Sequence, residues 1–131
     1  MAIATRVRDG VRILDMSGDF AVGRHIGQPI DLRGHRLEDL GETIGALLDA
    51  GVSKIVLNLE KVRFIDSAGL GQLIACRKRT LQRGGDIKLL NPGKQVHEVL
   101  VMTLLADVFE IHTDENEAVA SFNVPGLNRG S

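Results

Sequence analysis

The sequence predicts a single α/β domain: a mixed β-sheet that opens with a hairpin and continues with largely parallel strands, with about four helices packed on it. Short aliphatic runs alternate along the chain with stretches whose apolar residues recur at helical spacing, the order typical of an α/β sheet. Near the start, Asp9 and Gly10 separate two β-branched runs, and this dipeptide is favoured in hairpin turns. With 131 residues and no internal repeat, the chain suits one domain, which we place at residues 3–122, with 123–131 as a flexible tail.

In the first third of the chain, residues 3–17 are expected to form the two strands of the hairpin, with Gly18 and Asp19 closing the second strand. Residues 23–36 are rich in Gly, His and Arg and keep no steady period, so they are predicted to be a loop. A helix is predicted next, because apolar residues recur at helical spacing before Gly51, which suits a helix C-terminus. Its apolar positions are Leu37, Leu40, Ile44, Leu47 and Leu48.

The rest of the chain continues the alternation. Residues 54–59 are predicted to be a covered, central strand, and a helix follows the segment around Asp66. A strand over 86–90, a third helix, a strand over 108–111 and a last helix over 114–122 complete the expected order. The residues predicted to face the core from the helix after Asp66 are Leu70, Leu73, Ile74, Arg77 and Leu81. Those predicted to face it from the third helix are Val96, Val99, Leu100 and Leu104.

The composition excludes several classes of function. The 16 basic and 17 acidic residues nearly cancel, so no field of one sign attracts nucleic-acid phosphates or an anionic membrane. The 4 Phe, with no Trp or Tyr, leave few rings to stack on bases. Cys76 is the only cysteine, so no intrachain disulfide forms, and no apolar run approaches the ~18 residues of a membrane span. We expect a cytoplasmic protein that neither binds nucleic acid nor inserts into a membrane.

No catalytic or metal-binding arrangement is apparent. Ser67 lacks the nucleophile elbow of serine hydrolases, because Ile65 stands where that motif needs its first glycine. Cys76, alone on a helix, is expected to be packed and inert. The four histidines have no metal-ligand spacing: His25, His35, His97 and His112. We therefore expect no catalytic residue, no metal site and no cofactor.

The segment 62–71 is the one most informative about function, because it is predicted to be the loop that leaves a buried strand and enters an amphipathic helix. This places Asp66 and Ser67 at a helix N-terminus. Free backbone N–H groups and a partial positive charge there stabilise an anionic group by ~0.3–1 kcal/mol at exposed sites. A phosphoserine at Ser67 would be tolerated.

Two glycines in the same segment need an explanation, since Gly69 and Gly71 each cost ~1 kcal/mol of helix propensity relative to alanine. One interpretation is a bare surface beside Ser67 that another molecule can approach closely. The alternative is structural: Asp66 or Ser67 is an ordinary N-cap, and the small residues ease packing against the sheet.

The segments 57–59, 62–71 and 85–92 closely resemble the STAS domain family of bacterial anti-sigma factor antagonists. The resemblance runs from about Val11 to Phe122, and its Asp-Ser-x-Gly-Leu core follows an aliphatic strand and opens a helix, as in that family. It implies a STAS-type fold and a regulatory binding module that is not an enzyme.

The resemblance also implies a partner and a switch. The partner would be an anti-sigma factor that is also a serine kinase, with a serine phosphatase as a further candidate partner; the serine matching Ser67 is phosphorylated by the kinase. Unphosphorylated protein would bind the anti-sigma factor and free the sigma factor, thereby controlling transcription, and the isolated protein would be a monomer. The expected partner-binding residues are Asp19, Asp66, Ser67, Ala68, Gly69, Leu70 and Gly71.

The sequence departs from the family's pattern after the second strand. Asp19 keeps the first acid of that pattern, but Ala21 stands where a second acid is common. This departure favours the alternative function, a constitutive STAS subunit of a transport complex or stress-signalling scaffold. The basic run from Arg77 to Arg79, with Arg83, is expected to be a solvated helix face, the alternative being that it helps an acidic partner dock.

Overall fold

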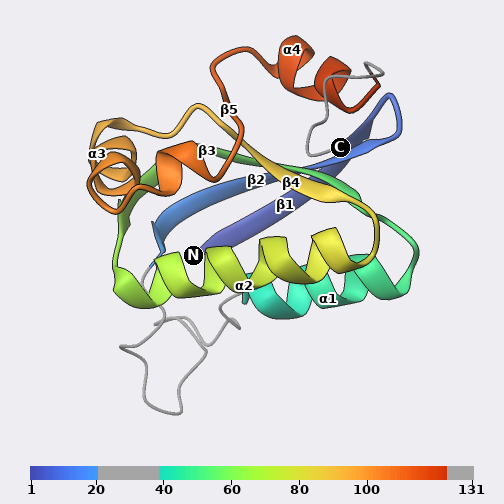
Figure 1. The fold of residues 1–131 in the computed structure, drawn as a ribbon, viewed down its shortest axis with the longest axis horizontal. Helices are drawn as coiled ribbons and strands as arrows, with labels where there is room; N and C mark the ends of the chain where they lie inside the picture. Colours follow the sequence, from blue (N-terminus) through green and yellow to red (C-terminus); the bar gives the residue numbers. More distant parts are fainter. Residues whose placement is uncertain (21–38, 124–131) are drawn as a thin grey trace.

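The computed structural model describes residues 1–20 and 39–123. Its core is a five-stranded sheet in the order β1-β2-β3-β4-β5 (Figure 1). Strand β1 (Ala2–Arg8) runs antiparallel to β2 (Val11–Phe20), and the turn between them has φ of 50° at Asp9 and 80° at Gly10. Strands β3 (Lys54–Ile65), β4 (Asp86–Leu90) and β5 (Ile111–His112) continue the sheet in parallel. The predicted hairpin and mixed sheet are confirmed.

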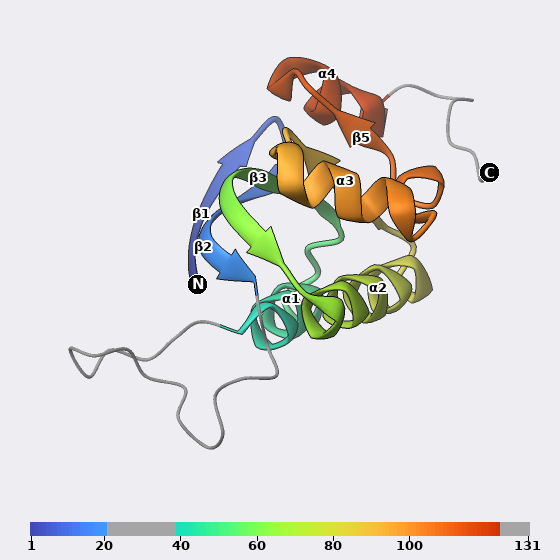
Figure 2. The same ribbon diagram turned by 90° about the vertical axis from the view of Figure 1, so that its left-hand side faces the viewer.

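The described residues contain four α-helices: α1 (Leu40–Asp49), α2 (Ser67–Gln82), α3 (Lys94–Met102) and α4 (Glu115–Ala120). Two short 3₁₀ turns accompany them, η1 (Leu105–Asp107) and η2 (Ser121–Asn123). Helices α1 and α2 lie side by side below the sheet, and α4 lies on the other side, near the hairpin (Figures 1 and 2). The predicted single α/β domain with four helices is confirmed.

Both faces of the sheet are covered by apolar side chains. The main core joins one face to α1, α2 and α3 and includes Leu57, Leu73 and Leu100, all fully buried. A smaller core joins the opposite face to α4 through Ile13, Val56 and Val119. The sheet is therefore fixed from both sides, and the ends of its strands stand at defined places.

Three predicted strand boundaries were wrong. Gly18 and Asp19 do not close β2, which continues to Phe20 because these residues pair with the far end of β3 across two register shifts. For the same reason β3 runs to Ile65, so residues 62–65 are strand and not loop. The last strand is Ile111–His112 and not 108–111, because η1 occupies the preceding turn.

Two helix predictions also need correction. Leu104 lies outside α3, exposed and with a left-handed φ of 66°, so the helix ends before it. On α2, Ile74 and Leu81 are not core residues, since their side chains are 43% and 45% exposed. The buried face of α2 instead consists of Gly69, Leu70, Leu73, Cys76 and Thr80. The predictions for Leu37 and the loop 23–36 lie outside the described residues, as does the tail predicted over 123–131 except for Asn123, which belongs to η2.

Candidate functional site at the start of helix α2

Asp66 forms the junction between β3 and α2. Its backbone is extended, with φ −108° and ψ −178°, and its carboxylate accepts a hydrogen bond from the Gly69 N–H at 2.8 Å. Its carbonyl accepts the first intrahelical bond, from the Leu70 N–H at 2.9 Å. Asp66 is thus the N-cap of α2, as the structural alternative expected for this residue.

Ser67 is the first residue of α2, and its side chain is exposed. Within residues 1–20 and 39–123 its hydroxyl has no hydrogen-bond partner, and the N–H groups of Ser67 and Ala68 have no acceptor. A hydroxyl placed in this way is accessible to a modifying enzyme. The two N–H groups, at the positive end of the helix dipole, are suited to an anionic substituent.

Three other segments hold this junction in place. The Asp66 N–H donates to the Phe20 carbonyl of β2 at 3.3 Å, and the Ile65 N–H donates to the Gln95 Oε1 of α3 at 3.2 Å. One turn into α2, the Gln72 Nε2 donates to the carboxylate of Asp39, the N-cap of α1, at 3.1 Å. The position of Ser67 is therefore set by β2, α1 and α3 together.

The two glycines of the segment have different surroundings. A Cβ on Gly69 would lie 2.3 Å from the Phe20 carbonyl oxygen, whereas a Cβ on Gly71 would have no atom within 4 Å. Gly69 therefore lets α2 pack against the end of β2, in line with the structural alternative. Only Gly71 provides the bare surface that the other interpretation expected.

The remaining expected site residues divide by exposure. Ala68 and Gly71 are exposed beside Ser67, while Gly69 and Leu70 are buried. Asp19 is exposed in β2, opposite Phe64 in the strand register, and makes a long ion pair with Arg63 at 3.7 Å. Of the expected partner-binding residues, the exposed ones are thus Asp19, Ser67, Ala68 and Gly71.

Two residues near the site were not anticipated. Phe64 is 43% exposed although it is aromatic and ends a buried strand. Gln95 supports the junction from α3, 30 residues further along the chain. An exposed position for Phe64 follows from the shifted register at the end of β3, which the strand's composition does not reveal.

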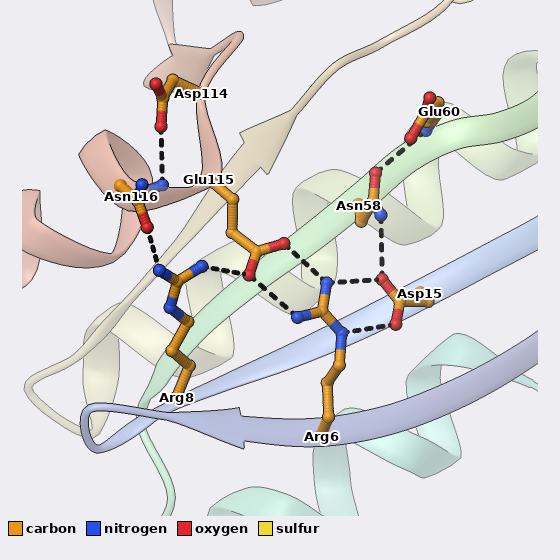
Figure 3. Close-up of polar contacts among 8 residues, drawn as sticks. All are labelled: Arg6, Arg8, Asp15, Asn58, Glu60, Asp114, Glu115 and Asn116. Atoms are coloured by element: carbon orange, nitrogen blue, oxygen red, sulfur yellow. Dashed lines mark hydrogen bonds and ion pairs between the residues drawn. The ribbon is translucent and has the colours of Figure 1, made fainter.

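A second polar cluster lies on the opposite face of the sheet (Figure 3). The Arg6 guanidinium joins the carboxylates of Asp15 and Glu115 at 2.7 Å each, and Arg8 joins Glu115 at 2.7 Å and contacts Asn116. Hydrogen bonds from Arg6 and then Arg8 lower the pKa of Glu115 to about 2 against an opposing effect of burial. Because its charges satisfy one another, this cluster fastens α4 to the hairpin and offers no open site.

The other candidate residues have ordinary surroundings. Cys76 is buried, which confirms that it is packed, and burial raises the pKa of its thiol to about 11. His97 is exposed on α3, and His112 contacts the Glu110 carboxylate at 2.6 Å. His25 and His35 lie outside the described residues. Among the helices that the structure describes, none has the length and apolar character needed to cross a membrane.

Comparison with known proteins decides the family. The model of the STAS domain matches residues 2–118. The chain belongs to the STAS domain family. Several proteins that this chain resembles are named anti-sigma factor antagonists.

One of the similar proteins is named for its role as an antagonist of an anti-sigma factor. An anti-sigma F factor antagonist of Paenibacillus polymyxa is 33% identical over 70 residues, which is 53% of this chain and 60% of that protein. The match thus spans well under two thirds of the relative's length.

Solved structures share the fold. A candidate anti-sigma factor antagonist from Thermotoga maritima superposes with a TM-score of 0.72 at 23% identity, covering 93% of this chain and 95% of that one. The antagonist SpoIIAA in its unphosphorylated form gives 0.62 at 23% identity, covering 98% and 100%. SpoIIAA of Bacillus has also been solved in a phosphorylated form, with 0.62 at 21% identity and 90% and 96% covered.

Proposed function

We propose that this STAS domain is an anti-sigma factor antagonist that docks on an anti-sigma factor serine kinase through the surface around Ser67 and is switched off when Ser67 is phosphorylated. The observation that carries the proposal is the exposed Ser67 hydroxyl, without a partner among the described residues, at the first position of α2. The names of the relatives and the existence of a phosphorylated SpoIIAA support it.

The unphosphorylated surface suits close contact with a protein. Ala68 and Gly71 present almost no side chain next to Ser67, and Phe64, three residues before Ser67, presents an exposed ring. Aromatic side chains are enriched in protein interfaces because they bury much area at little entropic cost.

Phosphorylation would oppose this contact without disturbing the fold. A phosphate adds about −1.5 to −2 charges at neutral pH beside the carboxylate of Asp66. The free N–H groups of Ser67 and Ala68 stabilise it locally, so α2 stays folded. The charge must then be desolvated when a partner docks, and this cost prevents binding.

The test is phosphosite mapping of the protein isolated from its native cell during growth and after stress. We expect one phosphate on Ser67 whose occupancy changes with condition. Incubation with ATP, Mg²⁺ and an anti-sigma factor kinase from the same organism should label the wild type and the Ser17→Ala control, and not Ser67→Ala. Unlabelled wild type under every condition would contradict the switch.

A further inference from the structure

Helix α2 carries a second stripe that faces away from the core. Ser67, Gly71, Ile74, Lys78 and Leu81 follow one another at steps of four, three, four and three residues, and all five are exposed. We name these five residues the Ser67 stripe. Its spacing is the one at which helices pair in coiled coils, whereas the sheet side of α2 is occupied by its own buried residues.

The stripe has the composition of a contact surface. Ile74 and Leu81 are 43% and 45% exposed and lie two turns apart on it. Single exposed apolar residues are common, but two at heptad spacing form an apolar line along the helix. The whole Ser67 stripe, from Ser67 to Leu81, extends about 21 Å along the helix at ~1.5 Å per residue.

The charges of α2 indicate which partner fits. The helix contains Arg77, Lys78 and Arg79 and no Asp or Glu. Arg77 pairs with Asp86 at 3.0 Å and Arg79 donates to the Gly41 carbonyl, but Lys78 has no partner within residues 1–20 and 39–123. A second copy pairing through this face would bring both sets of basic side chains together without an acid. An acidic partner helix is complementary to it.

We propose that the Ser67 stripe receives an amphipathic helix of the anti-sigma factor, with apolar side chains on Ile74 and Leu81 and an acidic side chain opposite Lys78. This inference rests on the proposed function and extends the contact from Ser67 along the whole of α2. The small residues Ser67 and Gly71 let the partner helix approach closely at one end. At the other end, Leu81 borders an open pocket of about 600 Å³, which it shares with apolar Val108 and with charged residues that include Arg77 and Asp86.

The test is calorimetric titration of the anti-sigma factor encoded beside this gene into wild type, Ile74→Ser, Lys78→Glu and Ser67→Glu. Val101→Ser is the matched control, because Val101 is 49% exposed on α3, away from the stripe. Ile74→Ser and Lys78→Glu should each weaken binding by about tenfold or more, and Val101→Ser by less than about twofold. Circular dichroism establishes that each variant is folded.

The partner side of the contact is tested by charge exchange. Cross-linking of the complex at Lys78 first identifies the acidic residue of the partner that faces it. Changing that residue to lysine should restore binding to the Lys78→Glu variant and should weaken binding to the wild-type protein. Loss of binding in Ser67→Glu, with Ile74→Ser and Lys78→Glu equal to wild type, would overturn the helix contact and leave the proposed function standing. Absence of binding by unphosphorylated wild type would overturn both.

Discussion

At the scale of single residues, Gly69 and Gly71 show that the effect of a Gly→Ala change on stability depends on the surroundings of the added methyl group. Both lie in the first turns of α2, but only Gly69 faces the end of β2. The sequence shows that both glycines lower helix propensity. It does not show that the Phe20 carbonyl is the neighbour of Gly69, because the two residues are brought together by the pairing of β2 with β3.

We predict opposite effects of alanine at these two positions. Gly69→Ala places a Cβ 2.3 Å from backbone and should lower the free energy of unfolding by about 1–3 kcal/mol. Gly71→Ala meets open space and should raise it by about 0.5–1 kcal/mol through helix propensity. Urea unfolding of both variants measures the difference, and equal effects would refute the assigned packing of Gly69.

Glu115 gives a pH-dependent prediction. Its pKa falls from 4.5 to about 2 in the folded protein, so its ion pairs stabilise the fold above pH 4.5 and are lost as the pH falls from there towards 2. At pH 7, Glu115→Gln should be about 0.5–1 kcal/mol less stable than wild type. The gap should close near pH 2.

The control for this effect is Glu117→Gln, because Glu117 lies in the same helix and has no ion pair among the described residues. Urea unfolding across this pH range should show little change for the control. A Glu115→Gln deficit that persists at pH 2 would mean that packing, and not charge, holds α4 to the hairpin.

At the scale of elements, the sequence predicts the existence and type of each strand and helix better than its ends or faces. Helix α2 was placed after Asp66, and Asp66 proved to be its N-cap. Its stripe was wrong at Ile74 and Leu81, because apolar residues occur on two sides of this helix and periodicity alone does not say which side meets the sheet. The boundary of β3 was wrong because pairing with β2 extends the strand through Glu60 and Lys61, which have low β-propensity, as far as Ile65.

Gln95 provides a prediction at this scale, since it links α3 to the β3–α2 junction. Gln95→Ala leaves the Ile65 N–H without its acceptor and should cost about 1 kcal/mol of stability. Amide exchange should accelerate at Ile65 and Asp66. Glu98→Ala, an exposed change on the same helix, is the control, and equal exchange in the two variants would show that Gln95 does not support the junction.

At the scale of the whole molecule, the order of strands and helices follows from the alternation of patterns, and the position of Ser67 follows from the sheet. The carboxyl end of β3, the end of β2 and the N-cap of α1 meet at one edge, so the first turn of α2 is held by segments far apart in the chain. No sequence pattern specifies those contacts, because each depends on the completed sheet. Asp19 keeps the family pattern after β2, and Ala21, where the pattern changes, lies outside the described residues.

The function at this scale depends on whether one phosphate at the edge of the sheet controls partner binding. The near-neutral charge agrees with a module that docks on a protein partner and not on nucleic acid. A constitutive STAS subunit would use the same face without a switch, so the two functions differ in their response to phosphorylation.

The most direct measurement compares the affinity of the anti-sigma factor for the unphosphorylated protein and for the same protein carrying phosphate on Ser67. We expect phosphorylation to weaken binding by about a hundredfold or more, equivalent to roughly 3 kcal/mol. Equal affinity of the two forms would contradict the switch and identify the chain as a constitutive subunit.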